Sequence, residues 1–395
     1  MYRTLKVLGI TVLSLVVIGL VLLASASEEN GLRLYNSPYG FVMRQAIWLG
    51  VAFVFLLAAA FFDYHRWREW PWMTIAFYVL VVVLMASVFA FPATKGSHRW
   101  LRLGPMRMQP SEFAKILVVI STAVLLDRMG WRIERFWKGA VPAVLMVGVL
   151  MGLAVAEPDF GATMVIALTA GVLFFVAGMK VWHMGVMGLA GGCAVGTLLA
   201  FNANRMNRIL AWLPYDIAVK LGVPPEMLAA KADNAAEYQL NMALVAIRNG
   251  GVTGAPGLFR SWQKHGYLPE MHTDFIFAIG AEEWGLMFSI VLLLLFVAFF
   301  VCGMIIASHA PDRLGRLLAY GMTFLVFFQA VFNLGVVTGC LPTKGLALPF
   351  ISYGGSNLIT AMVAVGILFN IGRQIELPTP RSKGAGMSAF RAGIA

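Results

Sequence analysis

Apolar runs of about twenty residues recur along almost the whole chain, and they decide what it can fold into. A helix that crosses a bilayer needs about 20 apolar residues, because its backbone polar groups must all be paired within the segment. Hydrophobic residues make up 60% of the 395 residues and charged residues 12%, which excludes an ordinary soluble domain. We therefore predict an all-α integral membrane protein that forms a single domain over residues 1–395. The predicted transmembrane helices are 6–26, 45–62, 71–91, 111–127, 139–156, 161–179, 183–201, 283–307, 315–338 and 356–372.

The positive charges predict the orientation of these helices. The formal net charge is +11, and the basic residues lie in the short gaps between apolar runs. Such a distribution favours anionic head groups or an anionic lipid substrate as partners, and not nucleic acid. Because most basic gaps fall on one side, the positive-inside rule predicts that this side is cytoplasmic and that both termini lie there.

The N-terminal run and the cysteines each need a separate interpretation. Residues 1–26 resemble a signal peptide, but the apolar run is long and many further spans follow, so we predict a retained first helix. Three cysteines without metal-type spacing argue against a disulfide framework and a zinc site. No cofactor is expected, and the requirement for a divalent cation is left open.

One predicted outer loop breaks the charge rule. Between Phe91 and Glu112 the chain carries five basic residues and no acid. Spans that follow the first are sometimes tolerated whatever the loop charge, which is one explanation. The other is that an anionic group binds here, with Trp100 as an aromatic surface. The basic residues are Lys95, His98, Arg99, Arg102 and Arg107.

The helix after this loop begins with charged residues. Ser111 is the predicted N-cap and Glu112 lies in the first turn. Lys115 follows Glu112 by three residues, so the two share a helix face and can pair with each other. Lys115 could equally extend outward to a phosphate. The sequence leaves these alternatives open.

The segment Glu157–Gly161 is a predicted tight outer turn. Pro158 and Gly161 explain the turn, and Asp159 could simply cap the next helix. Two acids in this position would also hold the basic loop in place.

A short segment ahead of the eighth predicted helix concentrates the scarce acidic residues, of which the chain has only 19. Ionisable groups at the edge of the hydrocarbon tend to mark substrate or ion pathways. For Glu282 and Glu283, a place in the first helical turn is sufficient explanation. Asp274 lies in an otherwise apolar stretch and is the stronger functional candidate. The segment's ionisable residues are Glu270, His272, Asp274, Glu282 and Glu283.

Two outer segments complete the predicted layout. Residues 202–282 form the only long loop, with a predicted helix that ends near Arg248 and is followed by glycines. Residues 342–355 precede the last helix and are rich in Pro and Gly. Non-helical backbone at membrane depth is tolerated only inside protein or beside a water-filled cavity, so we predict a re-entrant loop that lines a cavity.

Several of these segments together resemble the SEDS (shape, elongation, division and sporulation) family, which includes FtsW and RodA. Met242-Ala243 and Pro256 depart from the usual family residues, which affects the expected loop shape and not the chemistry. Pro342–Gly345 is more similar to the division and sporulation branch than to the elongation branch. The matching motifs are Gly96–Leu101, Gln109–Lys115, Glu157–Gly161, Tyr238-Gln239, Leu268–Glu270, His272–Ile276 and Leu348–Ser356.

The resemblance implies a peptidoglycan glycosyltransferase that polymerises lipid II on the outer face of the cytoplasmic membrane. It also implies a class B penicillin-binding protein as partner, with other divisome or elongasome proteins. An α-linked donor and a β-linked product imply inversion through one displacement. Such a reaction needs a base, for which we choose Asp274, and cations that hold the departing diphosphate, for which Arg99, Arg102, Lys115 and Lys344 are candidates. The other expected substrate contacts are Trp100, Glu112, Asp159, Glu270, His272 and Ser352.

Three alternatives stay open at this point. The chain could belong to the RodA-type elongation branch instead of the division branch. Ten helices with membrane-edge charges would also suit a lipid II flippase. A scaffold that only recruits a transpeptidase is the third alternative, although it leaves the clustered charges unexplained.

Overall fold

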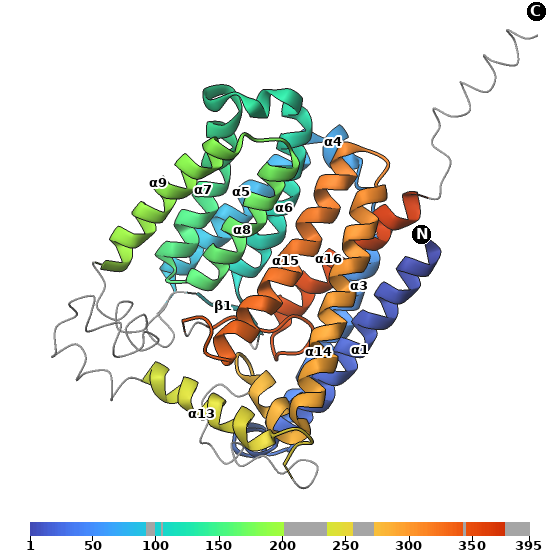
Figure 1. Cartoon of the computed structure of the whole chain (residues 1–395), viewed down its shortest axis with the longest axis vertical. Helices are drawn as coiled ribbons and strands as arrows, with labels where there is room; N and C mark the ends of the chain where they lie inside the picture. Colours follow the sequence, from blue (N-terminus) through green and yellow to red (C-terminus); the bar gives the residue numbers. More distant parts are fainter. Residues whose placement is uncertain (92–98, 104–105, 201–234, 256–271, 343–344, 376–395) are drawn as a thin grey trace, which may run out of the picture.

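A computed structural model describes residues 1–91, 99–103, 106–200, 235–255, 272–342 and 345–375. These residues form a helical bundle with one short two-stranded sheet (Figure 1). Strands β1 (Leu101–Leu103) and β2 (Met106–Met108) pair antiparallel, with Arg102 opposite Arg107. The long helices are α1 (Tyr2–Ala26), α3 (Gly40–Phe61), α5 (Pro71–Ser87), α6 (Pro110–Met129), α7 (Val141–Ala156), α8 (Phe160–Val176), α9 (Val181–Ala200), α13 (Ala235–Gly250), α14 (Ile276–His309), α15 (Arg313–Val337) and α16 (Gly355–Gln374). The shorter elements are α2 (Glu28–Tyr35), α4 (Arg66–Glu69), η1 (Val88–Ala90), η2 (Gly130–Glu134) and η3 (Phe136–Ala140).

Within the described residues, seven segments are long and apolar enough to cross a membrane. A helix also lies at the other three predicted ranges, as α6, α8 and α9. Helix α8 has only 17 residues, and α6 carries Glu112 and Lys115 near its start. Because most of α6 is buried inside the bundle, its charges contact protein and not lipid. The seven spans are Tyr2–Ala26, Gly40–Phe61, Pro71–Ala90, Phe136–Ala156, Ile276–His309, Arg313–Val337 and Gly355–Gln374.

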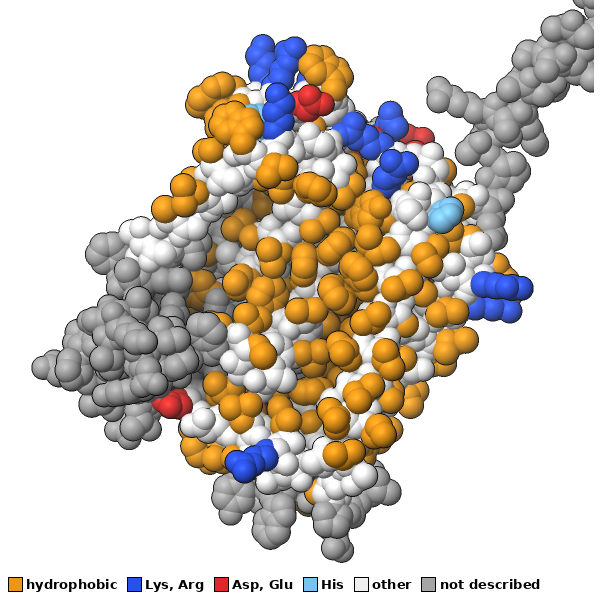
Figure 2. Space-filling view, viewed as in Figure 1, with side chains coloured by type: hydrophobic (Ala, Val, Ile, Leu, Met, Phe, Trp, Pro, Cys, Tyr) orange, Lys and Arg blue, Asp and Glu red, His pale blue; other side chains and the backbone are white. Residues whose placement is uncertain are grey.

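Helices α15 and α6 lie at the centre of the bundle. Helix α15 packs against α14, α8, α6 and α16, while α16 packs along α3, and α14 along α1. The apolar side chains between these helices form one continuous core. Large apolar side chains on the outer faces of the peripheral helices are exposed, and Figure 2 shows a broad apolar surface on the face of the bundle in view. This surface is where lipid would lie.

The start of helix α14 differs from the prediction. The helix begins at Ile276 and not at residue 283, and it is broken at Gly285, where φ is 71° and ψ is −161°. Glu282 and Glu283 therefore do not lie in a solvated first turn; both are buried, and Ser25 Oγ donates a 2.5 Å hydrogen bond to Glu283 Oε1. The apolar pattern continues ahead of Gly285, and no local residue pattern indicates that a loop packs against the break.

That loop follows α13, the described part of the predicted outer segment. Leu286 N donates to Gly251 O at 3.0 Å, and Ala255 N donates to Glu282 O at 2.9 Å. A Cβ at Gly254 would lie 2.2 Å from Glu283 O, so only glycine allows this approach. The remainder of predicted loop 202–282, at 202–234 and 256–271, lies outside the described residues.

The two ends of the bundle differ in character. One end carries β1, β2 and α13, and the other carries α4, η2, η3 and the start of α15 (Figure 1). We call the first the hairpin end and the second the basic end, because Lys and Arg side chains gather at the second (Figure 2). The basic residues there are Arg66, Arg68, Arg128, Arg132, Arg135, Lys138, Lys180, Arg313, Arg316 and Arg373.

Candidate functional site

Asp274 lies half-buried in the turn that leads into α14 at the hairpin end. Asn333 of α15 fixes the backbone of this turn, because its Nδ2 donates to Asp274 O at 2.7 Å and to Leu346 O at 2.6 Å. The Asp274 carboxylate lies against the backbone at Gly345, where an added Cβ would be 2.5 Å from Oδ2. α15 thus fixes the backbone of this turn, and the carboxylate that the turn carries lies against the segment after residue 344.

The segment Leu346–Ser352 is non-helical and almost completely buried among helices. Ser352 closes its turn, since Ser352 Oγ accepts from Leu348 N at 2.8 Å and Ser352 N donates to Leu348 O at 3.0 Å. Phe350 has a φ of 66°, a strained conformation for a bulky residue. The segment is held inside protein as the re-entrant prediction requires. Contact between Ser352 and a substrate stays a prediction.

Lys115 is buried and is paired within the bundle. Its Nζ lies 2.8 Å from Glu112 Oε2 and donates to Gln329 Oε1 at 2.7 Å. The lysine side chain is 0% exposed, so it does not extend outward in this structure. Of the two alternatives left open by the sequence, the pairing with Glu112 is the observed one.

Gln329 connects Lys115 to the re-entrant segment. Its Nε2 donates to Ala347 O at 2.9 Å and to Asn357 Oδ1 at 2.6 Å. Gln329 and Asn333 are four residues apart on one face of α15, so a single helix positions both Lys115 and Asp274. Neither amide is among the site residues predicted from the sequence. Their signal was available, since polar side chains one turn apart in an apolar helix tend to mark a functional interior.

Asp159 is a structural centre of the turn between α7 and α8. It caps α8, because its Oδ1 accepts from Ala162 N at 3.1 Å. Its Oδ2 accepts from Ser111 Oγ and Gln109 Nε2, both at 2.8 Å. The prediction that Ser111 is the N-cap of α6 is wrong: Gln109 is the N-cap, and the Ser111 hydroxyl donates to Asp159.

Arg99 anchors the segment before β1 to this same turn. Its guanidinium donates to the backbone carbonyl of Glu157 at 3.3 Å and also to that of Pro158. The basic loop is therefore held through carbonyl oxygens of the acidic turn, and not through a carboxylate ion pair in the described residues. The acidic turn holds the loop as predicted, by a different set of atoms.

Glu157 is the most unusual carboxyl group of the site. It is 0% exposed, and neither of its carboxyl oxygens has a hydrogen-bond partner among the described residues. Burial, and secondly the nearby Asp159, raise the pKa of Glu157 to about 8, against a smaller opposing effect of Arg99. Glu157 lies outside the helices on either side, at a turn between two of them.

Replacing Glu157 with Gln should flatten the pH dependence of stability. The usual Glu pKa is 4.5, so between 4.5 and about 8 the folded state binds more protons than the unfolded state. Stability contributed by the neutral form is therefore lost as the pH rises through this window. We expect Glu157→Gln to have a higher Tm than the parent protein at about pH 8 and a similar Tm at about pH 5.

The measurement is thermal unfolding of the detergent-solubilised protein across this pH range. Glu69→Gln is the matched control, because Glu69 is an exposed glutamate at the basic end. Identical pH profiles for Glu157→Gln and the parent protein would contradict the assignment of a neutral Glu157.

The remaining predicted site residues have varied positions. His272 is half-buried beside Asp274, with its ring 4.7 Å from that of Phe41, and its backbone O accepts from Tyr353 N at 3.1 Å. Trp100 is half-buried ahead of β1, and Arg102 lies on β1. Glu270 and Lys344 lie outside the described residues. Within those residues, no group of three or more His, Cys, Asp or Glu side chains could hold a metal ion.

This geometry joins a carboxylate to a buried charge pair through one re-entrant segment. Leu346 also packs this segment against α8, since a Cβ added at Gly161 of α8 would lie 2.6 Å from Leu346 Cγ. The site therefore has a positioned carboxylate at the hairpin end and a hydrogen-bonded polar layer one turn deeper. Such an arrangement suits proton transfer at a bound hydroxyl next to cationic loops.

Comparison with known proteins agrees with this description. The family profile FTSW_RODA_SPOVE, described as "Cell cycle protein", matches residues 6–376. A probable peptidoglycan glycosyltransferase FtsW from Geobacter sp. (strain M18) is 34% identical over 361 residues, which cover 91% of this chain and 94% of the relative.

Solved structures share the fold. A chain from a study of structural coordination of polymerization and crosslinking by a peptidoglycan synthase complex is 26% identical, with a TM-score of 0.72, and the match covers 94% of this chain and 98% of that one. The rod shape determining protein RodA of Thermus thermophilus is 25% identical, with a TM-score of 0.66 and coverage of 94% and 97%. With a family profile matched over nearly its full length, the chain belongs to the FtsW/RodA/SpoVE family of multi-pass bacterial membrane proteins.

Proposed function

We propose that this protein is a peptidoglycan glycosyltransferase that polymerises lipid II at the hairpin end of the bundle. The observation that carries the proposal is the Asp274 carboxylate, which lies against Gly345 in a turn whose backbone is fixed by an α15 amide that also fixes the re-entrant segment. The similarity to a relative named peptidoglycan glycosyltransferase supports it. The similarity to relatives named FtsW supports a role in cell division.

The proposed reaction is a single inverting displacement. Asp274 accepts the proton of the attacking sugar hydroxyl, the hydroxyl oxygen bonds to the anomeric carbon of the donor, and the bond from that carbon to the diphosphate breaks. A positioned base contributes roughly 10²–10⁴-fold. Arg102, Lys344 and Arg99 stabilise the departing diphosphate. Lys115 acts from one helical turn deeper, where its contacts with Glu112 and Gln329 hold its amino group in place.

The proposed topology has ten transmembrane helices, with the hairpin end outside and both termini in the cytoplasm. Helices at all ten predicted ranges support it, together with the gathering of Lys and Arg at the opposite end. Helices α6 and α8 would cross the membrane inside the bundle, where few of their side chains meet lipid. The long outer segment with α13 then lies next to the site.

A class B penicillin-binding protein is the proposed partner, with divisome proteins around it. The similarity to a chain of a peptidoglycan synthase complex supports a partner that cross-links the strands. The exposed apolar faces of peripheral helices provide surface for a partner's transmembrane helix.

The decisive experiment separates polymerase from flippase. A flippase needs a sealed bilayer, whereas a polymerase needs only substrate and its site. We expect the detergent-solubilised protein, with its class B partner supplied, to convert lipid II to long glycan. The product should form in the presence of moenomycin, which inhibits the unrelated penicillin-binding-protein transferases. If this mixture makes no glycan while the protein moves lipid II across vesicles, the transporter alternative holds.

Replacing Gly345 with Ala tests the positioning of the base. The new methyl group would lie 2.5 Å from Asp274 Oδ2, so the carboxylate must move while the backbone can stay. Because a displacement of about 1 Å can cost on the order of 10²-fold, we expect polymerisation to fall about 10- to 100-fold with little change in Tm. Gly152→Ala is the matched control, since nothing lies within 4 Å of a Cβ there. Full activity of Gly345→Ala would mean that the observed carboxylate position is not the reactive one.

A further inference from the structure

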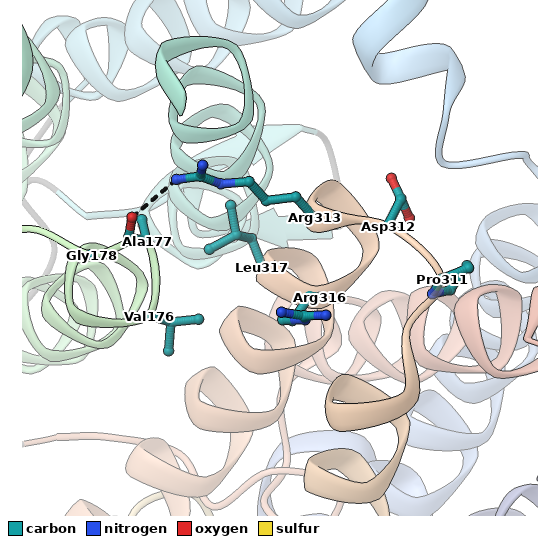
Figure 3. Close-up of a pocket in the computed structure, with 8 residues that line it drawn as sticks. All are labelled: Val176, Ala177, Gly178, Pro311, Asp312, Arg313, Arg316 and Leu317. Atoms are coloured by element: carbon teal, nitrogen blue, oxygen red, sulfur yellow. Dashed lines mark hydrogen bonds between the residues drawn. The ribbon is translucent and has the colours of Figure 1, made fainter. Parts of the chain in front are cut away.

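A cavity of about 390 Å³ lies at the basic end of the bundle, far along α15 from the candidate site. It is formed where α8 ends and α15 begins, between Val176 and Ala177 on one side and Arg313, Arg316 and Leu317 on the other (Figure 3). Neither the proposed polymerisation nor its partner makes use of this cavity.

The cavity presents two guanidinium groups. Arg313 is fixed, because its Nη2 donates to Ala177 O at 2.9 Å and to Gly130 O at 3.3 Å. Arg316 is exposed, and although its backbone N donates to Asp312 O at 3.1 Å, its side chain makes no hydrogen bond or ion pair with any described residue. One arginine is therefore held rigidly in the wall, and the guanidinium of the other remains available.

The acidic residue that lines the cavity, Asp312, makes its polar contacts with other residues and not with the two arginines. Asp312 Oδ1 accepts from Tyr64 OH at 2.6 Å and from Gly315 N at 3.2 Å, and its Oδ2 lies 3.8 Å from His65 Nε2. In Figure 3 the Asp312 side chain points away from Arg313 and Arg316. The space between the arginines thus attracts an anion, and a guanidinium fits phosphate oxygens with two parallel hydrogen bonds.

The aromatic side chains around the cavity indicate which class of anion binds in it. Exposed tryptophans lie around this end of the bundle, in the short elements and at the starts of helices. Tryptophan side chains are enriched in the same way at the head-group layer of a membrane. Phe175, next to the cavity wall, is 64% exposed on the outer surface of α8. A ligand with a phosphate and an acyl chain can pair its phosphate with the arginines and pack its acyl chain against the apolar side chains. The tryptophans are Trp70, Trp72, Trp131, Trp137 and Trp182.

We propose that this cavity binds the head group of an anionic phospholipid, with its phosphate between Arg313 and Arg316 and an acyl chain along Val176 and Phe175. The lipid would join the end of α8 to the start of α15, the helix that positions Lys115 and Asp274. This inference does not depend on the proposed enzymatic activity.

The test is native mass spectrometry of the purified full chain in detergent, with phosphatidylglycerol or phosphatidylcholine added. We expect preferential retention of phosphatidylglycerol. Removal of one cation near the head groups costs about 1 kcal/mol, so Arg316→Ala should lower this retention about 5-fold, and Arg316→Lys should restore most of it. Arg135→Ala is the matched control, because Arg135 is exposed at the same end and stacks on Trp131 instead of lining the cavity.

Three results would overturn the proposal. One is equal retention of the two lipids, and another is an unchanged or equally lowered retention in Arg316→Ala and Arg135→Ala. The third is displacement of phosphatidylglycerol by an equal concentration of inorganic phosphate, which would assign the cavity to free phosphate.

Discussion

Replacing Asp274 with Asn should abolish glycan polymerisation and leave the protein folded. Asn is nearly isosteric with Asp but cannot accept a proton, so the rate should fall by the contribution of a general base, roughly 10²–10⁴-fold. The fold should persist because the hydrogen bond that fixes this turn uses the backbone oxygen of Asp274, which the substitution retains.

The measurement is glycan chain length from lipid II, with Tm as the check on folding. Asp63→Asn is the matched control: Asp63 is at the basic end, and within the part of the chain that the structure describes its carboxylate accepts hydrogen bonds only from His65 and Gln374. The control should polymerise normally. If Asp274→Asn polymerises at nearly the parent rate, Asp274 is not the base, and Glu270 becomes the next candidate.

The sequence predicted the positions of the helices well because a run of about 20 apolar residues favours a membrane-spanning helix, and seven of the described segments are long and apolar enough to span. All ten predicted ranges contain a helix, and the i,i+3 spacing correctly suggested the pairing of Lys115 with Glu112. The Asp159 cap was also available from local chemistry, since Asp at a helix start is favoured by itself. These features depend only on neighbours in the chain.

The features that escaped prediction depend on contacts between distant segments. The Gly285 break exists because residues 251–255 pack against α14, which no local pattern in α14 reveals. Glu283 is buried through its contact with Ser25, 258 positions away. Likewise, Asn333 and Gln329 acquire their roles only when the re-entrant segment folds onto α15.

The candidate site shows the same difference between features set by the local sequence and features set by contacts between distant segments. Asp274 was chosen from its sequence context, but the contact with Gly345 that positions its carboxylate required the structure. Glu157 belonged to a recognised motif, yet its burial without a hydrogen-bond partner in the described part of the chain depends on how α7 and α8 pack. The sequence identified candidate groups, and tertiary packing sets the position of Asp274 and the burial of Glu157.

Replacing Lys115 with Ala should strongly destabilise the protein. The substitution leaves Glu112 buried without its cation and opens a cavity in the polar layer. Removal of one partner of a buried ion pair typically costs about 3–5 kcal/mol. We expect a large fall in Tm and loss of polymerisation. Lys138→Ala, at an exposed lysine of the basic end, is the control and should change neither.

A second variant separates the structural role of Lys115 from its role in catalysis. Lys115→Met together with Glu112→Gln removes both charges and keeps most of the volume, a replacement that is often neutral or stabilising for a buried pair. We expect this double variant to recover the Tm but not the polymerisation, because the positive charge behind the diphosphate site is gone. Recovery of both would make the pair a purely structural element. Polymerisation would then depend on the cations of the outer loops alone.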